Sequence, residues 1–229
     1  MKIRHLALAF LLNAAAFSSI YARVNVLLYH DVGKKASMFC QEKKNFEEQL
    51  KWLKENYSLV KLSELTPDST YQVVLTFDGA AGNFSKTIFP ILKKYGIKAD
   101  AYIVFNEIGN NEREWNDLKK IADDNLIEFG SHSMTHKHIN NLGFYAQDYE
   151  LSGSKTLLEE KLNIKIDSFA WPYGDYTKKL IEYGKKAGYE KFLTTNSMHS
   201  YWPDEIGRIT INGCWDFNKF IRAIRKRMR

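Results

Sequence analysis

Hydrophobic and polar positions along the chain form blocks that predict strands and helices in turn. Short apolar runs rich in valine and aromatic residues, such as 24–29, 71–77 and 99–105, are typical of buried strands. Segments with apolar residues three and four positions apart, such as 46–56 and 114–124, predict amphipathic helices. Because the two kinds of segment alternate, the pattern favours parallel βαβ units, arranged as a barrel or as a doubly wound sheet.

The predicted elements cover the chain from residue 23 to its end. The expected strands are 24–29, 59–62, 71–77, 99–105, 126–129, 166–170, 191–194 and 208–211. The expected helices are 46–56, 83–95, 114–124, 144–162, 177–187 and 217–227. In the second of these helices we expect Asn83 as the N-cap, a kink at Pro90 and Gly96 as the C-cap. No linker, repeat or low-complexity segment interrupts residues 23–229, which predicts a single domain.

The first 22 residues differ from this pattern. Lys2 and Arg4 precede an apolar stretch, 6–17, and small residues lead to Ala22. This arrangement is typical of a signal peptide cleaved after Ala22, and the apolar stretch is short for a membrane span. We therefore expect an exported protein, periplasmic or secreted. An uncleaved anchor or a buried N-terminal helix is the alternative.

Charge adds one feature to this picture. The formal net charge of +6 falls to +4 once Lys2 and Arg4 are removed. The excess gathers near the C-terminus, at Lys219, Arg222, Arg225, Lys226, Arg227 and Arg229. A basic terminal helix can contact an anionic surface or simply face solvent. Export argues against a nucleic-acid partner.

Composition and cysteine content set two further limits. Apolar residues make up 45% and aromatic residues 14% of the chain, which excludes a disordered protein. Cys40 and Cys214 can form a disulfide in an oxidising compartment, or remain two buried free thiols. The oligomeric state is not predicted by any feature of the sequence.

Candidate chemistry lies where predicted strands end. The strand 71–77 runs into Asp78, and the strand 126–129 runs into a segment that contains His132 and His136. The carboxyl ends of parallel strands meet at one edge of a sheet or barrel, so we expect these three side chains to converge. Two histidines four residues apart lie on one side of a helical turn, and a carboxylate completes a divalent metal site. Zinc is the first expectation for the metal.

The same residues also allow simpler structural roles. Asp78 precedes a glycine and can simply close an Asx turn. His132 and His136 can be surface or capping residues, and His138 offers a different pairing with His136. His30 ends the first strand and can also face the site, although a single histidine is often structural.

An aromatic turn follows the strand 166–170. Trp171, Pro172 and Tyr173 form it, and flat rings of this kind can stack on the apolar faces of sugars. We therefore assign these three residues to substrate binding. The alternative is ordinary packing at the edge of the core.

Together these motifs resemble the polysaccharide deacetylase family, the NodB homology domain of carbohydrate esterases. The resemblance is greatest to its exported poly-β-1,6-N-acetylglucosamine deacetylase branch. The matching segments are LLYH (27–30), FEEQL (46–50), VLTFD (74–78), FPIL (89–92), FGSHSMTH (129–136) and FAWPYG (169–174). They occur in the family's order and span nearly the whole chain after the predicted signal peptide.

The resemblance implies a fold and an activity. The fold is a distorted (β/α) barrel with its site at the carboxyl ends of the strands. The activity is hydrolysis of acetamido groups on an N-acetylated glycan, which releases acetate. The family's pattern places a zinc-type ion on one aspartate and two histidines, here Asp78, His132 and His136. It also assigns a carboxylate as the base and the backbone N–H after Pro172 to the oxyanion.

The chain departs from the family pattern in three places. The family has two adjacent aspartates, a base and a metal ligand, whereas Gly79 follows Asp78 here. Asp78 is therefore either the base or the ligand. Ala170 stands where another branch has arginine, and no Leu-x-His motif supplies a general acid, which leaves His30 or His199. The missing carboxylate keeps a catalytically silent, glycan-binding relative as the alternative function, with an O-acetyl esterase as a third.

Overall fold

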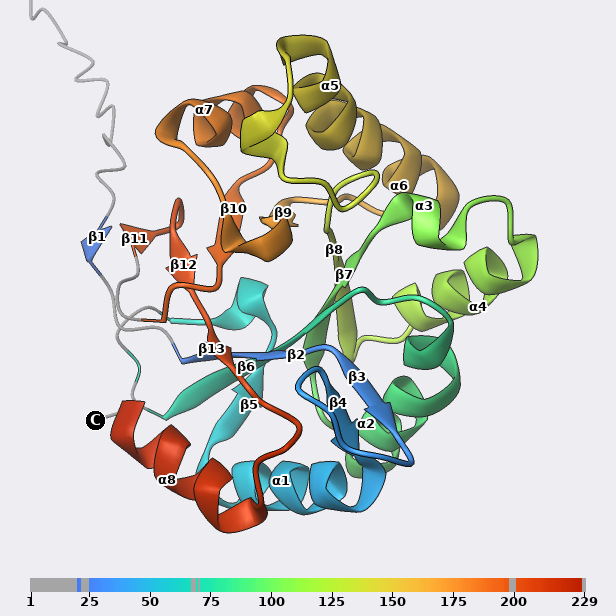
Figure 1. Ribbon diagram of the computed structural model, residues 1–229. Coiled ribbons are helices and arrows are strands. Elements are labelled where there is room, and N and C mark those ends of the chain that lie inside the picture. The colour runs from blue at the N-terminus through green and yellow to red at the C-terminus, as the bar shows by residue number, and fades with distance from the viewer. Residues whose placement is uncertain (1–19, 22–24, 67–68, 70, 198–200, 228–229) are drawn as a thin grey trace, which may run out of the picture.

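The computed structural model describes residues 20–21, 25–66, 69, 71–197 and 201–227, and in these residues parallel strands form a nearly closed barrel inside a ring of helices (Figure 1). The strands of the main sheet are β2 (Val26–Tyr29), β5 (Ser58–Val60), β6 (Gln72–Asp78), β7 (Ala99–Ile103), β8 (Ile127–Ser131), β9 (Ser168–Ala170), β10 (Lys191–Thr194), β12 (Ile206–Gly207) and β13 (Ile209–Thr210). Two small sheets join β1 (Ile20–Tyr21) to β11 (Tyr201–Trp202) and β3 (Asp31–Gly33) to β4 (Cys40–Glu42).

The helices follow the strands and cover the outside of the barrel. They are α1 (Lys43–Asn56), α2 (Phe89–Tyr95), α3 (Phe105–Ile108), α4 (Glu112–Ala122), α5 (Phe144–Asp148), α6 (Ser154–Leu162), α7 (Lys178–Lys186) and α8 (Phe217–Arg227). Short helical segments are η1 (Leu62–Glu64), η2 (Phe84–Ile88), η3 (Ile139–Asn141), η4 (Tyr149–Gly153) and η5 (Pro172–Gly174). Of the two arrangements that the sequence pattern allows, the structure confirms the (β/α) barrel.

The two ends of the barrel sheet meet at a single residue. The strands lie in the order β12-β10-β9-β8-β7-β6-β2-β13, with β5 also paired to β6, and all of these pairs are parallel. The two outer strands of this order, β12 and β13, are neighbours in sequence and are separated only by Arg208. Arg208 therefore lies at the seam of the barrel.

Alternation along β6 decides which side chains enter the barrel. Leu75 and Phe77 belong to the large apolar cluster that packs beneath the helices. Val74 belongs to the smaller cluster inside the barrel. Because side chains alternate along a strand, Thr76 and Asp78 point inward with Val74. The register of one buried strand thus places a carboxylate at the carboxyl end of the barrel interior.

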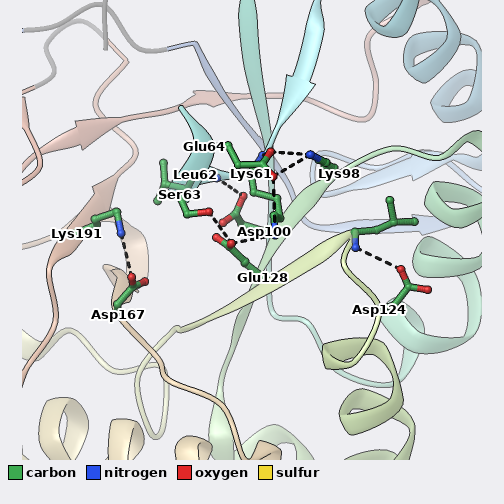
Figure 2. A network of polar contacts seen from close by, with 11 residues as sticks. Lys61, Leu62, Ser63, Glu64, Lys98, Asp100, Asp124, Glu128, Asp167 and Lys191 are labelled. Atoms are coloured by element: carbon green, nitrogen blue, oxygen red, sulfur yellow. Dashed lines mark hydrogen bonds and ion pairs between the residues drawn. The ribbon is translucent and has the colours of Figure 1, made fainter. Parts of the chain in front are cut away.

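A polar network lies near the amino ends of β7 and β8, away from that carboxylate (Figure 2). Asp100 is buried and accepts the backbone N–H of Leu62 at 2.9 Å. Glu128 accepts the Ser63 hydroxyl at 2.5 Å and pairs with Lys61 at 3.1 Å. These contacts hold the η1 segment against the amino-terminal end of the barrel, the end at which barrel proteins place residues that stabilise the fold.

The predicted helix 83–95 shows the clearest local differences from the structure. Asn83 does not cap it: its amide donates to the Val32 carbonyl at 2.8 Å, so the side chain ties β3 to this turn. The chain then makes the widened turn η2 before Pro90 enters the first turn of α2, where a missing N–H costs little. Gly96 ends the helix in the left-handed conformation, with φ of 61°, as predicted.

Three further expectations concern the signal peptide, the two cysteines and the membrane-spanning segments. The predicted signal peptide lies outside the described residues, apart from Ile20–Tyr21, which pairs with β11. Cys40 and Cys214 are both free thiols, and Cys214 is exposed rather than buried. In the part of the chain that the structure describes, no helix has the length and apolar character needed to cross a bilayer.

Candidate active site

The centre of the candidate site is a buried ion pair between Asp78 and Arg208. Arg208 donates to both carboxylate oxygens of Asp78, from Nη1 at 2.6 Å and from Nη2 at 2.8 Å. Its Nε donates to the Thr194 carbonyl at 3.2 Å, and its guanidinium lies over the Tyr102 ring. Such a two-pronged contact fixes the orientation of the carboxylate.

The same pair sets the charge of Asp78. Burial alone would raise the pKa of this carboxyl, but Arg208, helped by His132, outweighs it and lowers the pKa to about 2. Asp78 is therefore ionised at any neutral working pH. Sequence reasoning missed Arg208 as a site residue. The available signal was a lone arginine between the apolar residues Ile206 and Ile209 in a predicted terminal strand.

His132 directly follows β8 and turns its ring toward Asp78. Its Nδ1 donates to the Ala170 carbonyl at 2.7 Å, and its Nε2 lies 3.6 Å from Oδ2 of Asp78. A carbonyl oxygen can only accept, so the hydrogen is on Nδ1 and the Nε2 lone pair faces the site. Burial lowers the pKa of His132 to about 4 against the opposing effect of Asp78, so the ring is neutral.

His136 reaches the same place by a loop rather than by the helical turn expected from its spacing. Ser133 and His136 both have positive φ, 73° and 57°, and the segment between them is not helical. The ring centroids of His132 and His136 nevertheless lie 4.8 Å apart. His138 instead stacks on Tyr173 at 3.9 Å. The structure therefore pairs His132 with His136 rather than His136 with His138.

A buried glutamate holds the histidine loop in this shape. Glu150 accepts the backbone N–H of Met134 at 3.0 Å and of Thr135 at 2.9 Å, and also bonds the Thr135 hydroxyl. Its position in the middle of the predicted helix 144–162 gave no sign of this contact. Glu150 positions His136 through the loop and has no other described role.

His30 lies at the carboxyl end of β2, and its Nδ1 is a buried atom without a hydrogen-bond partner among the described residues. Burial lowers the pKa of His30, and the negative charge of Asp78 acts in the opposite direction. The exposed ring of Phe39 packs on His30 with centroids 4.9 Å apart. His30 is thus near the site, with one buried ring nitrogen that has no partner among the described residues.

Of the three residues assigned to substrate binding, only Tyr173 has an exposed ring. Tyr173 is 55% exposed and lies 4.7 Å from the His136 ring, centroid to centroid. Trp171 is 1% exposed and packs against core aromatic rings, and Pro172 is also buried. The predicted sugar stacking is therefore open to Tyr173 but not to the Trp171 ring, which belongs to the core.

The donor set fits a divalent ion only in part. His132 presents a neutral, correctly oriented nitrogen beside His136, as a metal ligand pair requires. Both oxygens of Asp78 are taken by Arg208, whose positive charge also disfavours a cation there. Among the described residues, no three histidine, cysteine or acidic side chains are arranged to hold a metal. The expected Asp78, His132 and His136 ligand set is therefore not preformed.

Comparison with known families identifies the scaffold. A family model described as polysaccharide deacetylase matches residues 66–192, more than half of the chain, and this segment carries both Asp78 and the histidine loop. The chain belongs to the polysaccharide deacetylase family. The match ends before Arg208, so the closing strand and its arginine lie outside the segment that defines the family here.

Individual relatives agree with this family assignment. The chain is 29% identical over 182 residues to YxkH of Bacillus subtilis, named as a polysaccharide deacetylase. It is 26% identical over 230 residues to the poly-β-1,6-N-acetyl-D-glucosamine N-deacetylase of Escherichia coli K12. These alignments cover 76% and 77% of this chain but only 65% and 34% of the two relatives.

Solved structures of deacetylases share the fold. A Bacillus cereus polysaccharide deacetylase superposes with a TM-score of 0.76 and 23% identity, over 88% of this chain and 68% of that one. The Streptococcus pyogenes deacetylase PplD, solved with acetate, gives 0.75 and 21%, over 90% of this chain and 99% of that one. At these identities the likeness establishes the barrel and not the chemistry.

Proposed function

We propose that this protein removes acetyl groups from the amino sugars of an N-acetylated polysaccharide and releases acetate. The observation that carries the proposal is the position of Asp78, an ionised carboxylate held by Arg208 and facing a neutral His132 at the carboxyl end of the barrel. Barrel enzymes place their chemistry at this end. Membership in the polysaccharide deacetylase family supports the choice of an acetamido substrate.

The reaction needs one water, and the residues of the chain divide its proton transfers. Each Asp78 oxygen keeps a lone pair beyond its bond to Arg208, so the carboxylate can accept the proton of the attacking water. The water oxygen bonds to the acetyl carbon and the carbon–nitrogen bond breaks. The proton that Asp78 accepts must reach the nitrogen of the departing amine, and His30, with its unpartnered Nδ1, is the candidate to take it up and pass it on.

We propose that a divalent ion, zinc first, assists this step. His132 and His136 would hold it through their imidazole nitrogens. When bound there, it would supply Lewis acidity to the acetyl carbonyl oxygen. The backbone N–H of Tyr173, next to Pro172, stays the predicted second donor to that oxygen.

A catalytically silent, glycan-binding relative is the second candidate function. The observation in its favour is Gly79, which leaves the strand end with Asp78 as its one carboxylate, already paired with Arg208. Loss of a carboxylate from such a site can cost several orders of magnitude in rate. Tyr173 and Phe39, both exposed beside site histidines, would still offer rings to a sugar.

Acetate release separates the two functions. The chain, starting at residue 23 and supplied with zinc, is incubated with N-acetylglucosamine oligomers and with an O-acetylated glycan. Release from the oligomers supports the deacetylase, and release from the O-acetyl glycan alone points to an esterase. Binding of the oligomers without any acetate identifies the silent relative and refutes the proposed activity.

Location and further contacts are also proposals. We propose that residues 1–22 direct export, so that the glycan is met in the periplasm or outside the cell. The exposed basic side chains of α8, including Arg222 and Lys226, are proposed to contact an anionic surface. A nucleic-acid partner is not part of this proposal.

A further inference from the structure

The pairing of Asp78 with Arg208 leaves the two site histidines without an anionic partner for a cation. We propose that Glu107 supplies this partner and that a divalent cation is held by His132, His136 and Glu107. The inference deepens the proposed function, on which it rests for the role of the cation. No sequence motif pointed to Glu107.

The topology places Glu107 at the right strand end. β7 lies between β6, which carries Asp78, and β8, which leads to the histidines. The α3 turn begins directly after β7, and its Phe105 N–H donates to the Ser133 carbonyl at 3.2 Å. The next N–H, of Asn106, donates to the Met134 carbonyl at 3.0 Å. The turn that carries Glu107 is thus bonded directly to the histidine loop.

The side chain of Glu107 reaches toward the gap left by a glycine. A Cβ atom at position 79 would lie 3.8 Å from Oε2 of Glu107 and within 4 Å of no other atom outside its chain neighbours. The Glu107 carboxylate has no hydrogen bond or ion pair with the described residues. By contrast, Glu114 near the same turn accepts a hydrogen bond from the Ser85 hydroxyl at 3.0 Å and forms an ion pair with Lys86 at 3.8 Å. Glu107 is therefore the free carboxylate beside the site in the part of the chain that the structure describes.

The resulting donor set is chemically sound. Two imidazole nitrogens and one glutamate oxygen form a ligand set that catalytic zinc uses, with a fourth position left open. The Nδ1 hydrogen of His132 on the Ala170 carbonyl is the outer contact that orients such a ligand. The three groups are not preformed as a metal site, so the inference requires the Glu107 side chain to turn toward the imidazoles. Glu107 is exposed, and such a turn does not disturb the core. Asp78 then stays with Arg208 as the base.

Zinc binding by the metal-free chain, starting at residue 23, tests this assignment without any turnover. Zinc is titrated in competition with a chromogenic chelator against the wild type, Glu107→Gln and Glu112→Gln. Glu112 is an exposed acid at the start of α4 that pairs with Lys161 and serves as the matched control. We expect one site in the wild type and in Glu112→Gln, and at least a tenfold weaker one in Glu107→Gln.

Placing a carboxylate at position 79 gives a second test of zinc affinity. Gly79 has φ of 71°, a conformation that aspartate adopts more readily than most residues. Gly79→Asp in the Glu107→Gln chain should recover zinc affinity. Equal affinity of Glu107→Gln and the wild type, or no zinc site in the wild type, would overturn the inference. Zinc binding that depends on Glu107 but yields no acetate would instead refute the proposed function alone.

Discussion

At the scale of single residues, Arg208 compensates the negative charge of the buried Asp78. Asp78 and Arg208 are both buried, and each satisfies the other's charge. Removing one partner of such a pair leaves an uncompensated charge in the core, which costs far more than the pair contributes. Arg208 also bonds the Thr194 carbonyl and so helps to fasten the barrel seam.

Arg208→Met should therefore lower the free energy of unfolding by about 3–5 kcal/mol. Urea denaturation of the chain starting at residue 23 gives this quantity directly. The matched control is Arg222→Met on the exposed face of α8, which should stay within about 0.5 kcal/mol of the wild type. An Arg208→Met protein as stable as the control would show that the ion pair does not support the fold.

The two nearby histidines, His136 and His138, should differ in their effect on metal content. His136 contacts the His132 ring, whereas His138 stacks on Tyr173 and pairs with Asp175 at 3.5 Å. We expect His136→Ala to lower the bound zinc per chain and His138→Ala to leave it unchanged, as measured by elemental analysis. The same loss in both variants would contradict the choice of ligands.

Residue patterns predicted which histidines and which aspartate come together, but not how they are held. Asp78 and His132 end strands, and strand ends of a parallel barrel share one rim. Arg208 could not be assigned, because its partner lies 130 positions away and depends on how the barrel closes. Trp171 was misassigned because an aromatic turn has the same sequence whether its ring faces sugar or core.

At the scale of elements, the histidine loop depends on the helix that follows it. Glu150 in η4 accepts two backbone N–H groups of the loop, from Met134 and Thr135. Without this acceptor, the buried Met134 N–H and its neighbour lose their partner. The loop conformation, with positive φ at Ser133 and His136, would then no longer be fixed.

Glu150→Ala should destabilise the protein by about 1–3 kcal/mol because it leaves buried donors unsatisfied. It should also weaken zinc binding, since His136 is carried by the same loop. Thermal or urea unfolding and the zinc titration measure the two effects. Glu160→Ala, on the exposed face of α6, should change neither the stability nor the zinc affinity. A Glu150→Ala protein with the same stability and zinc affinity as this control would show that Glu150 does not hold the histidine loop.

The opposite end of the barrel predicts a dependence of stability on pH. Burial and the nearby Glu128 and Asp167 raise the pKa of Asp100 well above its usual value, against the Leu62 N–H and Lys61. A carboxyl whose pKa is higher in the folded state stabilises the fold below its unfolded pKa near 4, and that stabilisation is lost as the pH rises.

Asp100→Asn should remove this dependence while keeping an acceptor for Leu62. Relative to the variant, the wild type should lose stability by up to about 1.4 kcal/mol per pH unit above pH ~4, until Asp100 ionises in the folded state. Urea denaturation of both proteins at pH 4, 5, 6 and 7 gives the comparison. A difference that does not change with pH would contradict the assignment.

Element boundaries show the limits of periodicity. The run 71–77 and the strand β6 (Gln72–Asp78) nearly coincide, because a buried parallel strand is apolar on both faces. The predicted helix 83–95 instead begins with a widened turn, because Asn83 is taken by β3 and cannot cap it. Such a contact between distant segments has no local signal.

At the scale of the whole molecule, the alternation of strands and helices predicted parallel βαβ units but left barrel and open sheet equally possible. The short segment 206–210 decides between them, since its two halves pair with β10 and with β2 across Arg208. Closure of the barrel brings Arg208 to Asp78. The fold and the candidate site are therefore completed by the same short segment.

The central claim is that the rim of this nearly closed barrel hydrolyses an acetamido group with Asp78 as its base. The most direct test is the rate of acetate release from N-acetylglucosamine oligomers by the zinc-loaded wild type and by Asp78→Asn, which is isosteric but uncharged. The account predicts release by the wild type and a loss of at least about a hundredfold in the variant. Equal rates in the two proteins, or no acetate from the wild type, would contradict it.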